Sequence, residues 1–186
     1  MARESLHERG INYLWERAFD WIADVGRIAM LVGETFRTLG HGLRSFRLVV
    51  DEMFAIGVQS LLLVFIVSLF TGAVAAVQAA YQFSTVVPLK YIGSVILRSV
   101  IIELGPVLTA LIVGGRVGAA IAAELGTMRV TEQIDALEAM AINPVRYLVV
   151  PRVVAAIIML PILTMIANGI AIFGGYIVSV TSIGVP

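Results

Sequence analysis

The sequence predicts an all-α integral membrane protein with a single domain over residues 1–186, and composition is the first reason. Of its 186 residues, 59% are hydrophobic and only 14% are charged, against ~45–50% apolar and ~25% charged residues in an average soluble domain. No charged residue occurs from Met53 to Leu89 or from Val153 to Pro186, and about 20 apolar residues suffice to cross a bilayer. Tyr91 to Ala123 reads as a third, more polar span. We therefore expect about three transmembrane helices, over residues 53–81, 91–123 and 147–180.

The charge balance and the missing residue types exclude several classes of function. Thirteen Lys and Arg cancel thirteen Asp and Glu, so the chain has no basic excess that would attract nucleic acid. Without cysteine, disulfides and thiolate metal sites are excluded. The two histidines, His7 and His41, both precede the spans, which argues against an intramembrane Ser-His pair or a zinc site. No phosphate-cradling GxxxxGK motif is present either. We expect no catalytic residue, metal or cofactor in this chain.

The first fifty residues predict an interfacial amphipathic helix. Apolar residues recur there at spacings of three and four, which places them in one stripe, with charged residues on much of the remaining surface. A soluble coiled-coil arm is the alternative. A break is expected at Gly40 to Gly42. The stripe consists of Ile11, Leu14, Ala18, Trp21, Val25, Ile28 and Val32.

The distribution of positive charge predicts the orientation. Arg44 and Arg47 precede the first span, the next loop carries only Lys90, and the loop from about Arg116 to Arg152 carries four arginines. Because cytoplasmic flanks carry the positive excess, we place the N-terminus and the loop between spans two and three in the cytoplasm. No signal peptide is evident.

The third apolar stretch is longer than one straight crossing. It is therefore either one long helix bent near Pro161 or a span followed by the start of another. The expected breaks are Asn168-Gly169 and Gly174-Gly175.

Span two carries small residues at every fourth position, which lets a helix approach another closely. We favour packing within the subunit over self-association. A similar pattern on span one, at Gly72, Ala76 and Ala80, makes the two faces possible partners. The helix-packing positions of span two are Gly114, Gly118, Ala122 and Gly126.

The segment from residue 124 to 143 predicts a short cytosolic helix. Thr131 is suited to cap Glu132 to Met140, and Asn143-Pro144 is suited to end it. Its apolar side would be Ile134, Leu137 and Met140 or Ala141. The bilayer surface, the chain itself and a cytosolic partner are equally plausible surfaces for it to pack on.

One continuous run resembles a known family. From Glu103 to Arg152 the sequence reads ELGPVLTALIVGGRVGAAIAAELGTMRVTEQIDALEAMAINPVRYLVVPR, which is similar to the MlaE/YrbE permeases. These are the membrane subunits of ABC transporters that move phospholipids between the bacterial inner membrane and a periplasmic MCE-domain protein, which maintains outer-membrane lipid asymmetry. The resemblance extends more weakly over nearly all of the chain, although family members are longer and have further spans.

The resemblance implies partners and site residues. It implies a second copy of the chain, a cytosolic ATPase that binds Mg-ATP, an MCE-domain protein and phospholipid, and an inner-membrane location. The expected ATPase-coupling residues are Glu124, Arg129, Thr131, Glu132, Gln133, Ile134, Leu137 and Met140. The expected lipid-binding residues are Ala75, Gln78, Ala79, Gln82, Phe83, Val86 and Glu103.

Two alternatives belong to other classes. Intramembrane charges are costly and are often functional, so Glu103, Arg116 and Glu124 would suit a secondary transporter or an ion pathway. A membrane scaffold without a transport role is the other alternative.

Overall fold

The computed structural model describes residues 2–42, 46–83 and 92–183, and within these ranges every regular element is helical. The all-α prediction is therefore confirmed. A 3-10 turn, Val58–Ser60, joins α2 to α3, and π-helical turns occur at Val100–Leu104, Val145–Val149 and Ser179–Ile183. The α-helices are α1 (Ala2–Gly42), α2 (Phe46–Gly57), α3 (Leu61–Phe83), α4 (Ile92–Ser99), α5 (Gly105–Val130), α6 (Gln133–Ala139) and α7 (Val150–Val178).

Three helical segments of the described chain are long and apolar enough to cross a membrane: Phe46–Gln82, Leu97–Val130 and Val145–Thr181. The chain is a multi-pass membrane protein. The segments have 37, 34 and 37 residues, and at 1.5 Å per residue each exceeds the ~30 Å hydrocarbon core. The first begins before the predicted residue 53 and the second continues past residue 123, because polar residues there extend the same helices.

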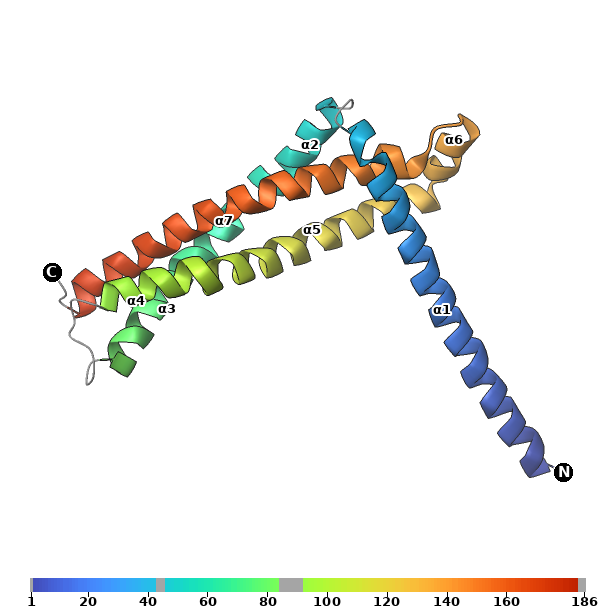
Figure 1. The fold of residues 1–186 in the computed structure, drawn as a ribbon, viewed down its shortest axis with the longest axis horizontal. Helices are drawn as coiled ribbons and strands as arrows, with labels where there is room; N and C mark the ends of the chain where they lie inside the picture. Colours follow the sequence, from blue (N-terminus) through green and yellow to red (C-terminus); the bar gives the residue numbers. More distant parts are fainter. Residues whose placement is uncertain (1, 43–45, 84–91, 184–186) are drawn as a thin grey trace.

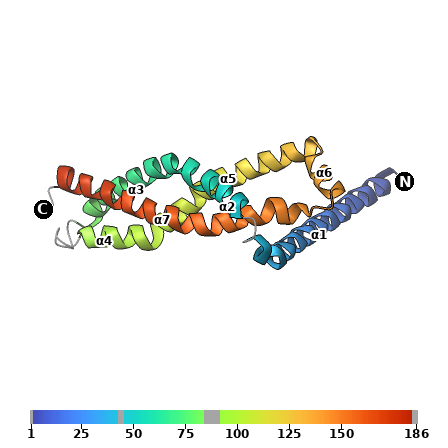
Figure 2. The same ribbon diagram turned by 90° about the horizontal axis from the view of Figure 1, so that it is seen from above.

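The three spans run alongside one another in an elongated bundle (Figures 1 and 2). The bundle has two distinct ends: α6 and the end of α1 lie at one, and α4 and the C-terminus lie at the other. Most of α1 extends away from the bundle as one continuous helix, which ends at Gly42, within the predicted break. The short α6 is therefore held far from the end at which α3 and α4 meet.

Helix α7 is the centre of the bundle, because α2, α3 and α5 all pack against it. The largest buried cluster joins these helices through branched and small side chains that fit closely together. A smaller cluster near the α4 end contains Ala76, Ala79, Val100 and Ala171. The main cluster consists of Val49, Ile56, Val64, Val113, Val150, Val154, Ala155, Leu163 and Ala167.

Glycines bring α3 and α7 into direct backbone contact. A Cβ atom added at Gly72 would lie 1.7 Å from the carbonyl oxygen of Ala171, and one added at Gly174 would lie 2.4 Å from that of Leu69. Real Cβ contacts essentially never fall below 3.0 Å. The partner of the small residues on span one is therefore α7, and the suggestion that span two is their partner is wrong.

The expected breaks in the third span are also wrong, since α7 continues without interruption from Val150 to Val178 with Pro161 inside it. Asn168 and Gly174 serve packing instead. The side chain of Asn168 occupies the space left by the missing Cβ of Gly105, and Gly174 allows the contact with α3. Small and polar residues that favour turns in water are compatible with a membrane helix when a neighbouring helix packs on them.

The small-residue face of α5 is uncovered. A Cβ atom added at Gly114, Gly118 or Gly126 would meet nothing within 4 Å, and Ala122 is exposed. The described helices do not use this face, so its role in helix packing stays a prediction.

Candidate functional site

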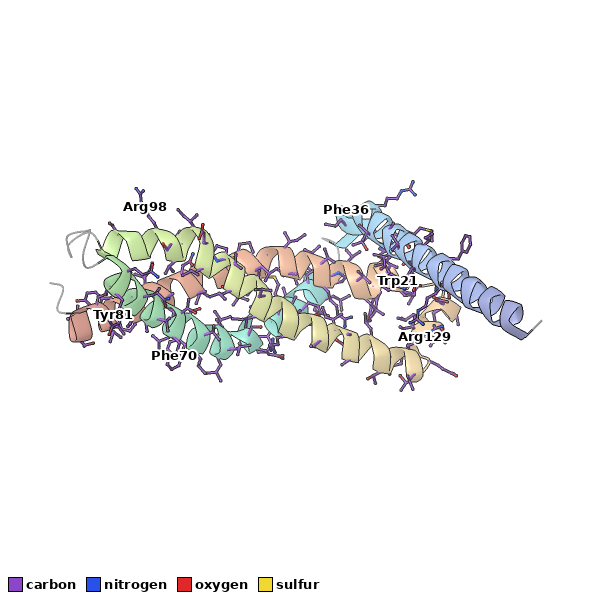
Figure 3. The ribbon with its side chains drawn as sticks, turned by 90° about the horizontal axis from the view of Figure 1, so that it is seen from below. Trp21, Phe36, Phe70, Tyr81, Arg98 and Arg129 are labelled. Atoms are coloured by element: carbon purple, nitrogen blue, oxygen red, sulfur yellow. The ribbon has the colours of Figure 1, made fainter. Side chains whose placement is uncertain are left out.

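An apolar cleft of about 650 Å³ lies along α3, at the end of the bundle near α4. Two neighbouring rows of α3 residues form most of its wall, each repeating every fourth position, and α4 and the following π-helical turn supply the rest. Phe70 projects from α3 and is 64% exposed (Figure 3). The rows are Ile66, Phe70, Val74, Gln78 and Gln82, and Val67, Thr71, Ala75 and Ala79; Ser99 and Leu104 complete the lining.

The character of the cleft changes along its length. Ile66 to Val74 supply aliphatic and aromatic surface, whereas Gln78, Gln82 and Ser99 supply neutral hydrogen-bonding groups nearer the α4 end. Among the described residues that line the cleft, none is charged. Such a surface fits an amphiphile with a long apolar portion better than an ion.

Four of the predicted lipid-binding residues, Ala75, Gln78, Ala79 and Gln82, lie on this wall. Glu103 does not line it and is exposed within the Val100–Leu104 turn. Val86 lies outside the described residues, as does the side chain of Phe83.

Sequence reasoning missed the deeper half of the cleft. Ile66, Phe70 and Val74 extend the row of Gln78 and Gln82 backwards at the same four-residue spacing, which was the available signal. Ser99 and Leu104 gave no comparable signal, because their place beside α3 depends on how the second span packs against the first.

Two left-handed residues bracket the short helix α6. Glu132 precedes it with φ 58° and Ala141 follows it with φ 59°. At its end the N–H of Ile142 donates to the carbonyl of Leu137 (3.0 Å) and the N–H of Ala141 donates to Glu138 (2.9 Å). This is the Schellman pattern, which usually has glycine in the left-handed position. The orientation of α6 is therefore set by two strained backbone positions.

The predicted capping residues of α6 were wrong in both places. Thr131 closes α5 instead, since its hydroxyl donates to the carbonyl of Thr127 (2.8 Å). Asn143-Pro144 starts the next helix: Asn143 Oδ1 accepts a hydrogen bond from the N–H of Arg146 (3.1 Å), and Pro144 takes the first helical position, where its missing N–H costs nothing. Sequence alone did not distinguish the end of one helix from the start of the next.

Contacts within the chain hold several of the predicted coupling residues. Arg129 at the end of α5 forms an ion pair with Asp135 of α6; Figure 3 shows Arg129 at this end of the bundle. Gln133 donates a hydrogen bond to the hydroxyl of Thr131 (3.0 Å). Of the apolar side of α6, Ile134 and Leu137 are half-buried.

Met140 and Glu132 are the freely presented members of the coupling set. Met140 is 63% exposed, and Glu132 is exposed at the left-handed position before α6. Glu124 lies further back, inside α5, and pairs with Arg152 (2.7 Å).

The structure does not gather Glu103, Arg116 and Glu124 into one pathway. Glu103 and Arg116 are thirteen positions apart, about 20 Å along a helix. Arg116 donates hydrogen bonds to Ser60 Oγ (2.7 Å) and Gln59 Oε1 (3.1 Å) of the first span. These contacts give Arg116 a partner within the bundle.

From Trp21 onward, the apolar stripe of helix α1 is exposed. Trp21 is 69% exposed, and Val25, Ile28 and Phe36 are also exposed; Trp21 and Phe36 are labelled in Figure 3. Near the C-terminal end of α1, Glu34 accepts a hydrogen bond from Asn143 Nδ2 (2.7 Å). This bond joins α1 to the segment that follows α6.

Comparison with known proteins gives consistent results. The family described as Permease MlaE matches residues 49–186. A probable ABC transporter permease protein of Rickettsia bellii is 47% identical over 169 residues, which is 91% of this chain and 65% of that protein. One from Synechocystis is 40% identical, covering 86% of this chain and 60% of that protein.

A third relative has a more specific name. The intermembrane phospholipid transport system permease protein MlaE of Haemophilus influenzae is 35% identical over 94% of this chain and 67% of its own length. The chain thus spans 60–67% of the length of these three relatives. From the match over residues 49–186 and these identities, the chain belongs to the MlaE permease family.

Proposed function

We propose that this chain is the membrane subunit of an ABC transporter that moves phospholipid between the bacterial inner membrane and a periplasmic MCE-domain protein, so maintaining outer-membrane lipid asymmetry. The cleft of about 650 Å³ along α3 is the observation that carries the proposal. An uncharged, largely apolar cleft on a membrane helix suits an acyl chain, and a solute that is hydrated in the cytosol would gain little there.

The change from apolar to polar lining along the cleft indicates how the lipid lies in it. The acyl chain packs on Ile66, Phe70 and Val74, and the head group lies near Gln78, Gln82 and Ser99. With the N-terminus in the cytoplasm, the polar end faces the periplasm, where an MCE-domain protein would exchange lipid. A second copy of the chain, related by a twofold axis, closes the open side.

The helix α6 is the docking element for the ATPase. The exposed Met140, which directly follows it, suits an apolar contact, and Glu132, which directly precedes it, suits a polar one. The ATPase must bind two states of the permease with different affinity, because a partner indifferent to the state shifts no equilibrium. Closure of two nucleotide-bound ATPase subunits then moves α6, and the cleft narrows and releases its lipid.

The stripe on α1 rests on the membrane surface. Exposed aromatic and aliphatic side chains on one side of a helix, with charges on the other, are typical of an interfacial helix. The bond between Glu34 and Asn143 keeps that helix beside the coupling segment.

Co-purification tests the proposal. The full-length protein is extracted from its own membranes and analysed by native mass spectrometry for bound proteins and lipids. We expect an ATPase, an MCE-domain protein, two permease copies and phospholipid in one particle. Met140→Glu should remove the ATPase, because a charge on the docking surface must be desolvated, whereas Ala139→Ser on the same helix should retain it.

Two results would contradict the proposal. A particle that contains no ATPase would refute the ABC permease function and favour the ion-pathway or scaffold alternatives. A particle with an ATPase but without phospholipid would refute the substrate assignment alone.

A further inference from the structure

A buried arginine connects all three spans at the α6 end of the bundle. The side chain of Arg152, on α7, is only 6% exposed. Its Nε lies 3.0 Å from Glu52 Oε1 of α2, and its Nη2 lies 2.7 Å from Glu124 Oε2 of α5. Removing one partner from such a cluster leaves an uncompensated buried charge, which is strongly destabilising. These three residues form one electrostatic unit.

A second arginine connects the first and second spans, further from the α6 end of the bundle. Arg116 of α5 donates hydrogen bonds to Ser60 and Gln59, which lie in the turn between α2 and α3. Arg116 and Glu124 are eight residues apart, about 12 Å along a helix, and so are Ser60 and Glu52. The two connections are therefore parallel rungs between antiparallel helices.

The space between the rungs is hollow. A cavity of about 60 Å³ separates the two helices, with Ala55 and Ile56 on one side and Val117 and Ala120 on the other. A single water needs ~10–15 Å³, so the hollow has room for several. Along this stretch polar side chains join the first and second spans around a space, and Ile56 beside that space also belongs to the main buried cluster.

The pairing of Arg152 is incomplete in this arrangement. Its Nη1 is buried and has no hydrogen-bond partner among the described residues. A buried charged donor without a partner is costly. The side chain of Glu124 is 55% exposed and that of Glu52 is 25% exposed, so Glu124 is the least enclosed member of the cluster. Of the three groups, Glu124 can therefore move with the least loss of packing.

The rungs lie between the coupling helix and the cleft. Glu124 precedes the end of α5 at Val130 by less than two turns, and Arg129 in that last turn is ion-paired with α6. Ser60 immediately precedes α3, whose residues from Ile66 onward line the cleft. A movement of α6 thus reaches α3 through α5 and the two rungs.

We propose that Arg152, Glu52, Glu124 and Arg116 form a coupling joint, which passes movement of α6 to the first span and thereby opens and closes the α3 cleft. The inference rests on the proposed permease function and adds the positioning residues that transmit its motion. A purely structural role makes a different prediction. A buried ion cluster replaced as a whole by uncharged residues of similar size often loses no stability, so such a replacement would then leave the response to nucleotide unchanged.

Cross-linking across the hollow measures the movement directly. Residues 1–186 contain no cysteine, so Ala55→Cys and Ala120→Cys, introduced into the full-length protein assembled with its ATPase, are the only thiols in this part of it. The rate at which a short bifunctional thiol reagent joins the pair is compared without nucleotide and with a non-hydrolysable ATP analogue. We expect a change of about fivefold or more, the usual size of an allosteric coupling.

Neutral variants then test the residues. The triple variant Glu52→Gln, Glu124→Gln and Arg152→Met should lose the nucleotide dependence of cross-linking and should move less lipid per ATP hydrolysed. Thr164→Val is the matched control, since its hydroxyl bonds the carbonyl of Leu160 within its own helix (2.8 Å). It should keep the wild-type nucleotide dependence.

The outcomes separate this inference from the proposed function. Equal cross-linking rates in both nucleotide states of the otherwise wild-type protein would overturn the coupling joint, even if the triple variant failed to fold. A folded triple variant that kept the full nucleotide dependence would overturn it too. An assembly whose joint responded to nucleotide but which moved no lipid would refute the phospholipid function and leave the joint supported. Failure of any ATPase to bind would refute both.

Discussion

Replacing Gly72 with alanine should separate the first and third spans. The added Cβ would lie 1.7 Å from the carbonyl oxygen of Ala171, where ordinary contact begins at 3.4 Å. The obstacle is backbone inside a continuous helix, so rotation of a side chain cannot relieve it. The helices must move apart by somewhat less than 2 Å, and buried contacts around Ala76 and Ala171 would be lost.

The loss of stability can be estimated from the cost of overpacking, and the same substitution at Gly169 provides a comparison. Forcing an extra methyl group into a packed interface costs about 1–3 kcal/mol and more where backbone must shift, so we expect about 3 kcal/mol. With ~2–4 °C per kcal/mol for a chain of this size, the apparent Tm should fall by roughly 6–12 °C. At Gly169, where an added Cβ meets nothing within 4 Å, the same substitution should be neutral or stabilising by up to ~1 kcal/mol.

Thermal unfolding in a mild detergent, followed by the loss of monodisperse protein on size exclusion, measures both variants. Gly174→Ala should behave like Gly72→Ala, because its Cβ would meet the carbonyl of Leu69 at 2.4 Å. A Gly72→Ala protein as stable as wild type, or a Gly169→Ala protein equally damaged, would refute the account of α3–α7 packing.

Three further predictions concern the coupling segment and the cleft. Ala141→Gly should stabilise the end of α6 by about 1 kcal/mol, because glycine adopts φ 59° without a Cβ clash; slower hydrogen exchange at Ile142 would show it, and faster exchange would argue against the strain. Asn143→Ala removes an N-cap and the bond to Glu34, so it should cost ~1 kcal/mol and increase exchange at the end of α1. Ala75→Phe should fill part of the cleft and reduce the phospholipid that co-purifies, and undiminished lipid would exclude this stretch of the wall.

The sequence predicted the features of the fold that depend on apolar length, and it did not predict those that depend on packing between helices. Apolar length alone determines whether a helix can cross a bilayer, so the three spans were predictable. The ends of the spans were harder to predict, because α5 continues through the polar residues after Ala123 up to Val130. Glycine in α7 was ambiguous, since only the position of α3 shows that Gly174 permits close packing.

The same distinction applies to the residues of the candidate site. The family resemblance pointed to span one, and four of the nine α3 residues that line the cleft were named from it. Ser99 and Leu104 lie on another span, and their place in the cleft depends on tertiary packing. Likewise nothing in the local sequence pairs Arg152 with Glu52, one hundred positions earlier.

Lipid cross-linking from within the cleft tests the central claim most directly. A photoreactive amino acid is placed at Val74, which lines the cleft, or at Met165 of α7, which is 74% exposed and does not line it. The assembled transporter is purified in detergent, illuminated and analysed by mass spectrometry. We predict a phospholipid adduct at Val74 that decreases with a non-hydrolysable ATP analogue, and little adduct at Met165. Equal adducts at the two positions, unchanged by nucleotide, would contradict a lipid site in the α3 cleft.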